Sequence, residues 1–173
     1  MDAEKFTKKS LEVIESCEKL AYEYNNQELT QAHLMYALVT VEDSLIAKLL
    51  TNMGINMDAF TGECEKLVAN RPKVSGGQLF TSPEFSKALI QAEKEAKQMG
   101  DDYISVEHIF LGLLEKADKD IKRVINAYGI TRGKFLEVLA NIRGNRKVES
   151  DNPEDTYDAL NKYGYNLVER ARE

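Results

Sequence analysis

Hydrophobic residues recur along this chain at intervals of three and four, the spacing of one buried helical face. In the first segment, from Thr7 to about Tyr24, the inward positions are Ser10, Val13, Ile14, Cys17 and Ala21. The same spacing predicts further helices at about 30–41, 44–53, 58–70, 82–99, 106–117, 119–128 and 132–143. Asp58 is the expected N-cap of the fourth helix. The pattern therefore predicts an all-α protein built from eight helices.

The helical pattern occurs twice, at an offset of 75 residues. The segment Thr30-Gln31-Ala32-His33-Leu34 recurs as Ser105-Val106-Glu107-His108-Ile109, Gly54-Ile55 as Gly129-Ile130, and Phe60 as Phe135. Each copy alone would leave its apolar face in water, so the two are expected to pack together. We predict one domain over residues 1–143 with pseudo-two-fold symmetry, made of repeats 1–70 and 79–143 and joined by a glycine-containing tether.

The pattern changes after residue 143. Residues 144–153 have no periodic apolar face and are predicted to form a linker. Residues 154–173 predict a short amphipathic helix that ends with nothing to pack against, which is typical of a truncated chain.

Composition limits the classes of function. The net charge of −6 argues against nucleic acid as the main partner, because a phosphate backbone needs a basic face. No apolar run approaches the roughly 20 residues of a membrane span, and the N-terminus does not resemble a signal peptide. We therefore expect a cytoplasmic protein with no membrane contact. Cys17 and Cys64 lie on apolar helical faces and are expected to be buried free thiols.

The sequence contains no convincing catalytic, metal or cofactor site. Two histidines, His33 and His108, are too few for a metal site, and their place in a first helical turn suits partly buried residues that complete helix caps. There is no nucleophile motif, and no glycine-rich loop followed by Lys and Ser or Thr that would hold the phosphates of ATP. We predict neither catalysis nor a cofactor for this chain.

The surface is the remaining candidate for function, because some apolar residues fall outside the inward faces. Leu11 and Ile90 lie on the corresponding first helices of the two repeats, and Leu79-Phe80 leads into the second of these helices. A contiguous apolar strip there would form a groove for unfolded polypeptide. The predicted substrate-binding residues are Leu11, Leu79, Phe80, Phe85, Leu89 and Ile90, with Thr7, Asp101 and Glu107 as a polar rim.

The doubled helix starts, (Thr/Ser)-x-x-His-(Leu/Ile), resemble the Clp N-terminal domain, which stands at the head of the Clp (Hsp100) AAA+ unfoldases. Resemblance to the ClpB disaggregase branch is carried by the stretches 5–10, 100–108, 142–144 and 152–164. The resemblance implies a double four-helix domain, a flexible linker, and residues 154–173 as the start of the first ATPase module. It also implies that Thr7, Asp101 and Glu107 are polar positions of the site.

The function implied by this resemblance is non-catalytic. The domain would capture exposed apolar segments of aggregated or unfolded proteins for an ATP-dependent disaggregase, a hexamer that works with the Hsp70 system in the stress response, while the isolated chain would be monomeric. The alternative is a module that docks adaptor proteins for a protease-coupled Clp ATPase. The ClpC branch carries Glu before both histidines, a pair suited to phosphorylated arginine. Here Ala32 replaces the first Glu, which disfavours that ligand.

Overall fold

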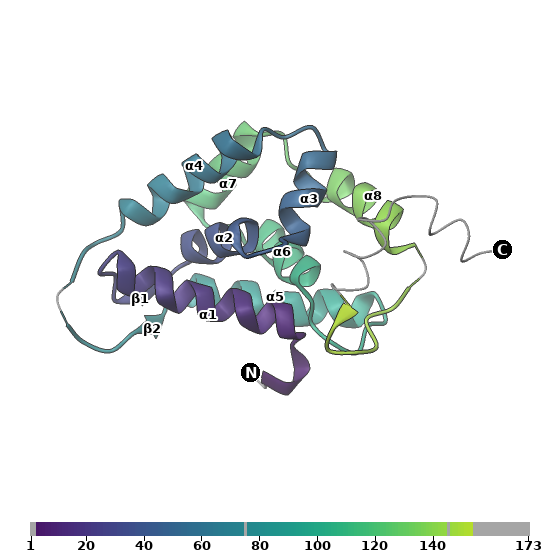
Figure 1. Cartoon of the computed structure of the whole chain (residues 1–173), viewed down its shortest axis with the longest axis horizontal. Coiled ribbons are helices and arrows are strands. Elements are labelled where there is room, and N and C mark those ends of the chain that lie inside the picture. The colour runs from purple at the N-terminus through teal and green to yellow at the C-terminus, as the bar shows by residue number, and fades with distance from the viewer. Residues whose placement is uncertain (1–2, 75, 145, 154–173) are drawn as a thin grey trace.

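The computed structural model describes residues 3–74, 76–144 and 146–153, and these residues form eight α-helices (Figure 1). Repeat one contains α1 (Lys8–Glu23), α2 (Gln31–Thr40), α3 (Leu45–Asn52) and α4 (Met57–Ala69). Repeat two contains α5 (Pro83–Gln98), α6 (Val106–Glu115), α7 (Lys119–Ala127) and α8 (Arg132–Arg143). A single turn of 3₁₀ helix, η1 (Ala3–Lys5), precedes α1. The all-α prediction is confirmed, whereas the helix predicted over 154–173 lies outside the described residues.

Each helix of repeat one has its counterpart 75 residues later, to within one residue at either end. Side chains at the N-caps explain the shared starts: Thr7 accepts a hydrogen bond from the Ser10 N–H (3.2 Å), and Ser82 accepts one from the Phe85 N–H (3.0 Å). The predicted cap of α4 is wrong, because Asn56 rather than Asp58 occupies that position. Asp58 lies inside the first turn, where its charge meets the positive end of the helix dipole.

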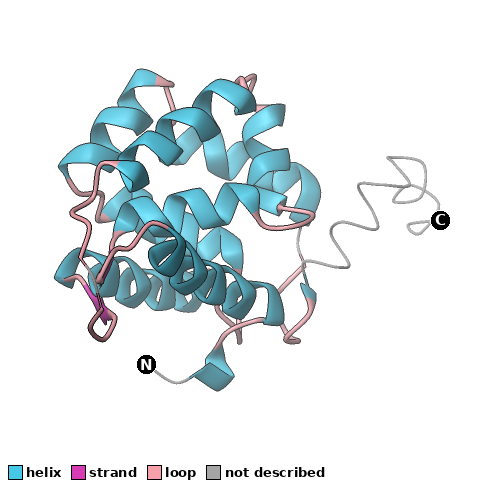
Figure 2. Cartoon of the chain, turned by 60° about the vertical axis from the view of Figure 1, so that its left-hand side comes forward, coloured by secondary structure: helices cyan, strands magenta, loops and turns pink. Residues whose placement is uncertain are grey.

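Two short parallel strand contacts, which the sequence did not predict, link the repeats. β1 (Glu28–Leu29) pairs with β2 (Phe80–Thr81), so that the entry to α5 lies against repeat one (Figure 2). The reciprocal contact is a bridge between Phe6, at the entry to α1, and Ile104 of repeat two. Because Leu29 and Ile104 are counterparts, as are Phe6 and Thr81, this reciprocity is the mark of a two-fold relation.

The core lies around α2 and α6, which run through the centre of the molecule (Figure 1). Eight residues of each of these ten-residue helices are buried, including both histidines. The largest buried side chains include four phenylalanines, of which Phe110 and Phe135 are in contact at a centroid distance of 4.5 Å. Phe60 packs edge-on against Tyr128 of the other repeat at a centroid distance of 5.2 Å, so an aromatic contact joins the two repeats.

The two central helices differ in how closely they approach the first helix of their own repeat. A Cβ atom placed on Gly112 of α6 would lie only 2.3 Å from the Ala88 carbonyl oxygen of α5. The counterpart of Gly112 is Ala37, which is buried without such a restriction. Glycine at position 112 therefore sets the close packing of α5 on α6.

The side chain of Gln31, at the start of α2, joins the repeats through a polar clamp. Its Nε2 donates to the carbonyl oxygens of Glu84 (3.0 Å) and Lys116 (2.7 Å). Its Oε1 accepts from the Asp118 N–H at 2.8 Å. This buried amide thus satisfies backbone groups at the start of α5 and between α6 and α7.

The structure also bears on the cysteines, on metal binding and on membrane-spanning helices. Cys17 and Cys64 are buried and free, as predicted, and burial raises the pKa of the Cys64 thiol to about 12. Within the described ranges, no three side chains of the metal-binding types are grouped for a metal ion. None of the helices in this part of the chain is both long and apolar enough to span a membrane.

Candidate functional site

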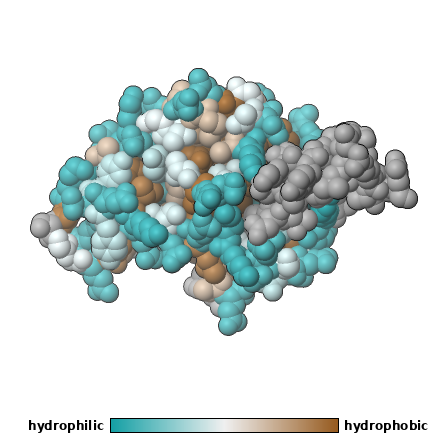
Figure 3. Space-filling view, viewed as in Figure 1, coloured by the Kyte–Doolittle hydropathy of each residue, from teal (hydrophilic) through white to brown (hydrophobic). Residues whose placement is uncertain are grey.

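The predicted apolar site residues divide into exposed and buried groups. Phe80 in β2 and Ile90 on α5 are 52% and 49% exposed. Leu11, Leu79 and Leu89 are half-buried. On the face drawn in Figure 3, small hydrophobic patches lie among a largely hydrophilic surface.

Phe85 does not belong to this surface, because it is only 2% exposed and lies in the core under the N-terminus of α5. Its predicted place in a surface groove is therefore corrected. Phe85, Ala88 and Ala92 follow one another at intervals of three and four, and all three are buried, so Phe85 belongs to the inward face of α5.

The predicted polar rim is also buried. Thr7 and Glu107 are fully buried, and the Asp101 side chain has no exposed surface. Thr7 is the N-cap of α1, and its hydroxyl donates to the Ser10 hydroxyl at 3.0 Å. Asp101 and Glu107 belong to an internal network around His108. The expectation that these three residues form an exposed rim is therefore wrong.

In repeat one, His33 completes a capping box at the start of α2. Its Nδ1 accepts a hydrogen bond from the Thr30 N–H (3.0 Å), and its Nε2 lies 2.8 Å from Asn26 Oδ1. Because a backbone N–H can only donate, Nδ1 carries no proton and Nε2 donates to Asn26. Burial, assisted by the charge of Arg71, lowers the pKa of His33 to about 4. The residue is fully buried and neutral, rather than partly buried as predicted.

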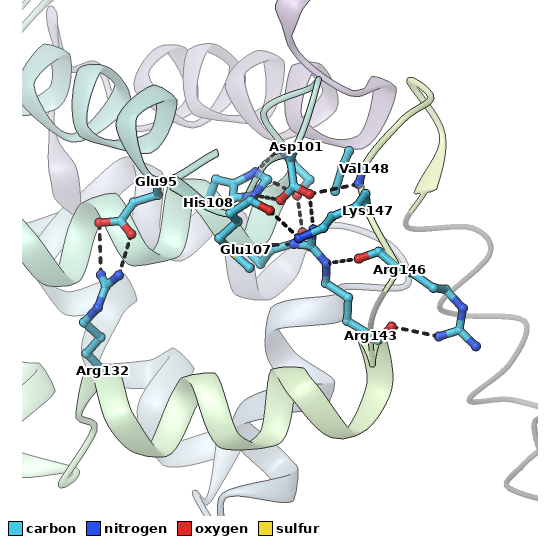
Figure 4. A network of polar contacts seen from close by, with 11 residues as sticks. Glu95, Asp101, Glu107, His108, Arg132, Arg143, Arg146, Lys147 and Val148 are labelled. Carbon is cyan, nitrogen blue, oxygen red and sulfur yellow. Dashed lines mark hydrogen bonds and ion pairs between the residues drawn. The ribbon is translucent and has the colours of Figure 1, made fainter. Parts of the chain in front are cut away.

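In repeat two, His108 makes the same contacts with charged neighbours (Figure 4). Its Nδ1 accepts from the Ser105 N–H (2.9 Å), and its Nε2 donates to Asp101 Oδ2 at 2.7 Å. Burial raises the pKa of the Asp101 carboxyl, but hydrogen bonds from His108, Arg143 and the Val148 N–H outweigh this effect and hold it below its usual range. Asp101 is therefore a buried carboxylate stabilised by its donors.

Arg143, at the end of α8, is shared by two buried carboxylates. Its Nη2 donates to Asp101 Oδ1, and its Nη1 lies 3.5 Å from Glu107 Oε2. The other Glu107 oxygen accepts from the Ser105 hydroxyl, whereas Oε2 has no hydrogen-bond partner in the described part of the chain. One guanidinium thus compensates two buried carboxylates.

The segment predicted as a linker continues this network. Its residues 146–152 form neither helix nor strand. Val148 is nevertheless fully buried, and its N–H donates to Asp101 Oδ1 at 3.1 Å. The Asp102 N–H donates back to the Val148 carbonyl oxygen (2.8 Å), and the Lys8 N–H donates to the Asp151 carbonyl oxygen (2.7 Å). Residues 146–151, which we call the strap, are therefore held against the domain.

The family described as the Clp repeat (R) N-terminal domain matches residues 5–128, which is more than half of the chain. The chain belongs to this Clp N-terminal family. Similar proteins include the chaperone protein ClpB of Nitratidesulfovibrio vulgaris, 42% identical over 99% of this chain, and ClpB of Clostridium tetani, 41% identical over 99%. The chain spans about a fifth of the length of these curated relatives.

Solved structures support the same fold. The Hsp104 N-terminal domain from Candida albicans aligns with a TM-score of 0.75 and 21% identity, over 85% of this chain and 97% of that one. The N-terminal domain of the Escherichia coli ATPase ClpV1 aligns with a TM-score of 0.69 and 14% identity, over 85% and 91%. At these identities the likeness shows the Clp N fold and nothing more specific.

Sequence reasoning missed the roles of Arg143 and Val148 in this Clp N-terminal domain. The signal for Arg143 was available, because the repeat offset aligns it with Val68 at the same time as it aligns Glu107 with Ala32. A carboxylate and a cation that replace apolar residues together indicate a paired burial. Val148 had no comparable signal, since it lies outside every helical pattern.

Proposed function

We propose that this Clp N-terminal domain recruits unfolded or aggregated polypeptides by apolar contact, as the non-catalytic substrate-binding domain of an ATP-dependent disaggregase. The observation that carries the proposal is the exposure of Ile90 and Phe80, at about half of each side chain, with Leu79 and Leu89 half-buried beside them in sequence. Leu89 and Ile90 lie on α5, Phe80 lies in β2, and Leu79 directly precedes β2. Similarity to ClpB chaperones supports the proposal.

Apolar contact of this kind suits weak and unselective binding. Unfolded proteins share exposed hydrophobic side chains and few other features, so a small surface can bind many of them. If the parent protein is a hexamer, repeated domains raise the apparent affinity by about 10²–10⁴ through avidity. Cooperation with an Hsp70 system would then involve other parts of the parent.

The test is a binding titration of the 173-residue chain with reduced, carboxymethylated α-lactalbumin, a permanently unfolded protein. The double variant L11D/I90D places charges in the predicted apolar surface and should weaken binding by about tenfold or more. Circular dichroism should show that helicity is unchanged. The matched control is Tyr22→Asp, because Tyr22 is 66% exposed on α1 but outside the predicted site.

If the unaltered chain and L11D/I90D bind the unfolded protein with equal affinity, the proposed binding surface is wrong. Saturable binding of a folded adaptor protein, with none of the unfolded protein, would favour the adaptor-docking alternative.

A further inference from the structure

The strap of repeat two shows how this fold holds an extended segment of polypeptide. Val148 buries its side chain completely and exchanges two hydrogen bonds with the loop between α5 and α6 (Figure 4). One of them runs from the Asp102 N–H to the Val148 carbonyl oxygen at 2.8 Å. The contact therefore combines one aliphatic side chain with one backbone donor of the loop.

Repeat one presents the corresponding loop without such a side chain. The counterpart of Val148 is Lys73, which is exposed and whose Nζ lies over the Tyr24 ring at 5.7 Å. The neighbouring chain still follows the loop, since the Val74 N–H donates to the Asn25 carbonyl oxygen at 2.7 Å. In repeat one, the buried side chain of Val148 is thus replaced by the exposed side chain of Lys73.

A cavity of about 190 Å³ lies at this place in repeat one. Its lining includes Asn26, Gln27 and Thr30, the counterparts of Asp101, Asp102 and Ser105 in repeat two. Val74 and Phe80, which are 41% and 52% exposed, also line it and give it an apolar wall. This volume leaves room for a branched aliphatic side chain.

The backbone donor is available as well. The Gln27 N–H corresponds to the Asp102 N–H that binds the strap, and no acceptor within residues 3–74, 76–144 and 146–153 bonds to it. Gln27 itself lines the cavity, whose wall is apolar at Val74 and Phe80 and polar at Glu28 and Arg71. An unpaired amide on a residue that lines such a cavity suits an extended peptide, which is recognised through its backbone and one side chain.

We infer that this repeat-one cavity binds an extended segment of unfolded polypeptide, with an aliphatic side chain in the place of Val148 and a carbonyl oxygen on the Gln27 N–H. The occupant is of the same chemistry as the strap but is supplied by another protein. The inference rests on the proposed function and extends its surface from Phe80, which lines the cavity, to repeat one.

The direct test is an NMR titration of the 173-residue chain with reduced, carboxymethylated α-lactalbumin. The Gln27 amide resonance should move on binding. That of Asp102 should not, because the Asp102 N–H already donates to the Val148 carbonyl oxygen of the strap. An unmoved Gln27 amide in the presence of bound probe overturns the inference. A Gln27 shift that depends on the concentration of the chain alone would identify a second copy as the occupant and would also overturn it.

A pair of matched variants tests the cavity independently. Val74→Trp fills the cavity from an exposed loop position and should weaken binding about three- to tenfold. Glu149→Trp is the control, because Glu149 is the exposed counterpart of Val74 beside the occupied surface of repeat two, and its affinity should equal that of the unaltered chain.

The outcomes separate the two proposals. Binding that survives Val74→Trp but is lost in L11D/I90D overturns this inference and leaves the proposed function standing. Failure of the unaltered chain to bind the probe overturns both.

Discussion

The two repeats share a backbone but differ in what they bury at the start of the central helix. In repeat one, His33 contacts Asn26, and the counterparts of Glu107 and Arg143 are Ala32 and Val68. Repeat two has Asp101, Glu107 and Arg143 at the three corresponding positions, around His108. A neutral set in one repeat is therefore matched by a charged set in the other.

A second pair of positions follows the same rule. Glu95, only 2% exposed, receives two hydrogen bonds from Arg132 at 2.6 and 3.0 Å. The counterparts in repeat one are Leu20 and Met57, which are half-buried against the core. The fold thus accepts either apolar or ionic partners at these places, provided that both change together, because a buried charge without its partner is strongly destabilising.

The largest effect is expected from breaking the charged set at Arg143. Arg143→Met leaves the Asp101 and Glu107 carboxylates buried without a cation, and should lower the free energy of unfolding by about 3–5 kcal/mol. Urea denaturation followed by circular dichroism measures this loss. The matched variant D101N/E107A/R143V gives repeat two the neutral residues of repeat one and should recover most of it. If Arg143→Met is as stable as the unaltered chain, the shared guanidinium is not needed.

The histidine of the neutral set should make stability depend on pH. The pKa of His33 is about 4 in the folded chain, against 6.5 for the free side chain. Between these values the unfolded chain binds the proton that the folded chain excludes, so the free energy of unfolding falls as the pH drops from 6.5 to 4, by about 3 kcal/mol in all.

His33→Gln tests this prediction, because glutamine at the third helical position can still complete a capping box but does not titrate. Urea denaturation at a series of pH values should show a flatter dependence between pH 6.5 and 4 for this variant. Parallel profiles for the variant and the unaltered chain would contradict the assignment to His33.

The helix packing gives a smaller, steric contrast between the repeats. Gly112→Ala forces a Cβ against the Ala88 carbonyl oxygen and should cost about 2 kcal/mol through overpacking. The counterpart change, Ala37→Gly, should cost only about 1 kcal/mol, mainly from helix propensity. Thermal unfolding of both variants compares them, and a stabilised Gly112→Ala would show that α5 and α6 can separate without loss.

The smallest effect is expected when the second ionic pair is exchanged as a unit. The double variant E95L/R132M reproduces the repeat-one residues and should change the free energy of unfolding by about 1 kcal/mol or less, whereas Arg132→Met alone should cost more because Glu95 stays buried. Chemical denaturation of the two variants decides. If E95L/R132M is less stable than Arg132→Met, an apolar pair cannot replace the ionic pair at these positions.

Much of this architecture could be read from the residue pattern. The three-and-four spacing of apolar residues predicted the helices, and the 75-residue offset predicted that the two repeats pack together. The sequence also placed Cys17 and Cys64 in the core and Ile90 and Phe80 outside it. Such features depend on the chain's local order, where helix caps and apolar spacing act over a few residues.

The tertiary structure alone decided which polar residues are buried. Asp101, Glu107 and Thr7 were predicted at the rim of a surface groove, partly because the family resemblance implies polar site positions there. Their burial depends on partners distant in the chain: Arg143 arrives from the end of α8, and Val148 from beyond it. Local pattern predicts where helices lie to within a residue or two, whereas the balance of charge in a buried site depends on groups that only folding brings together.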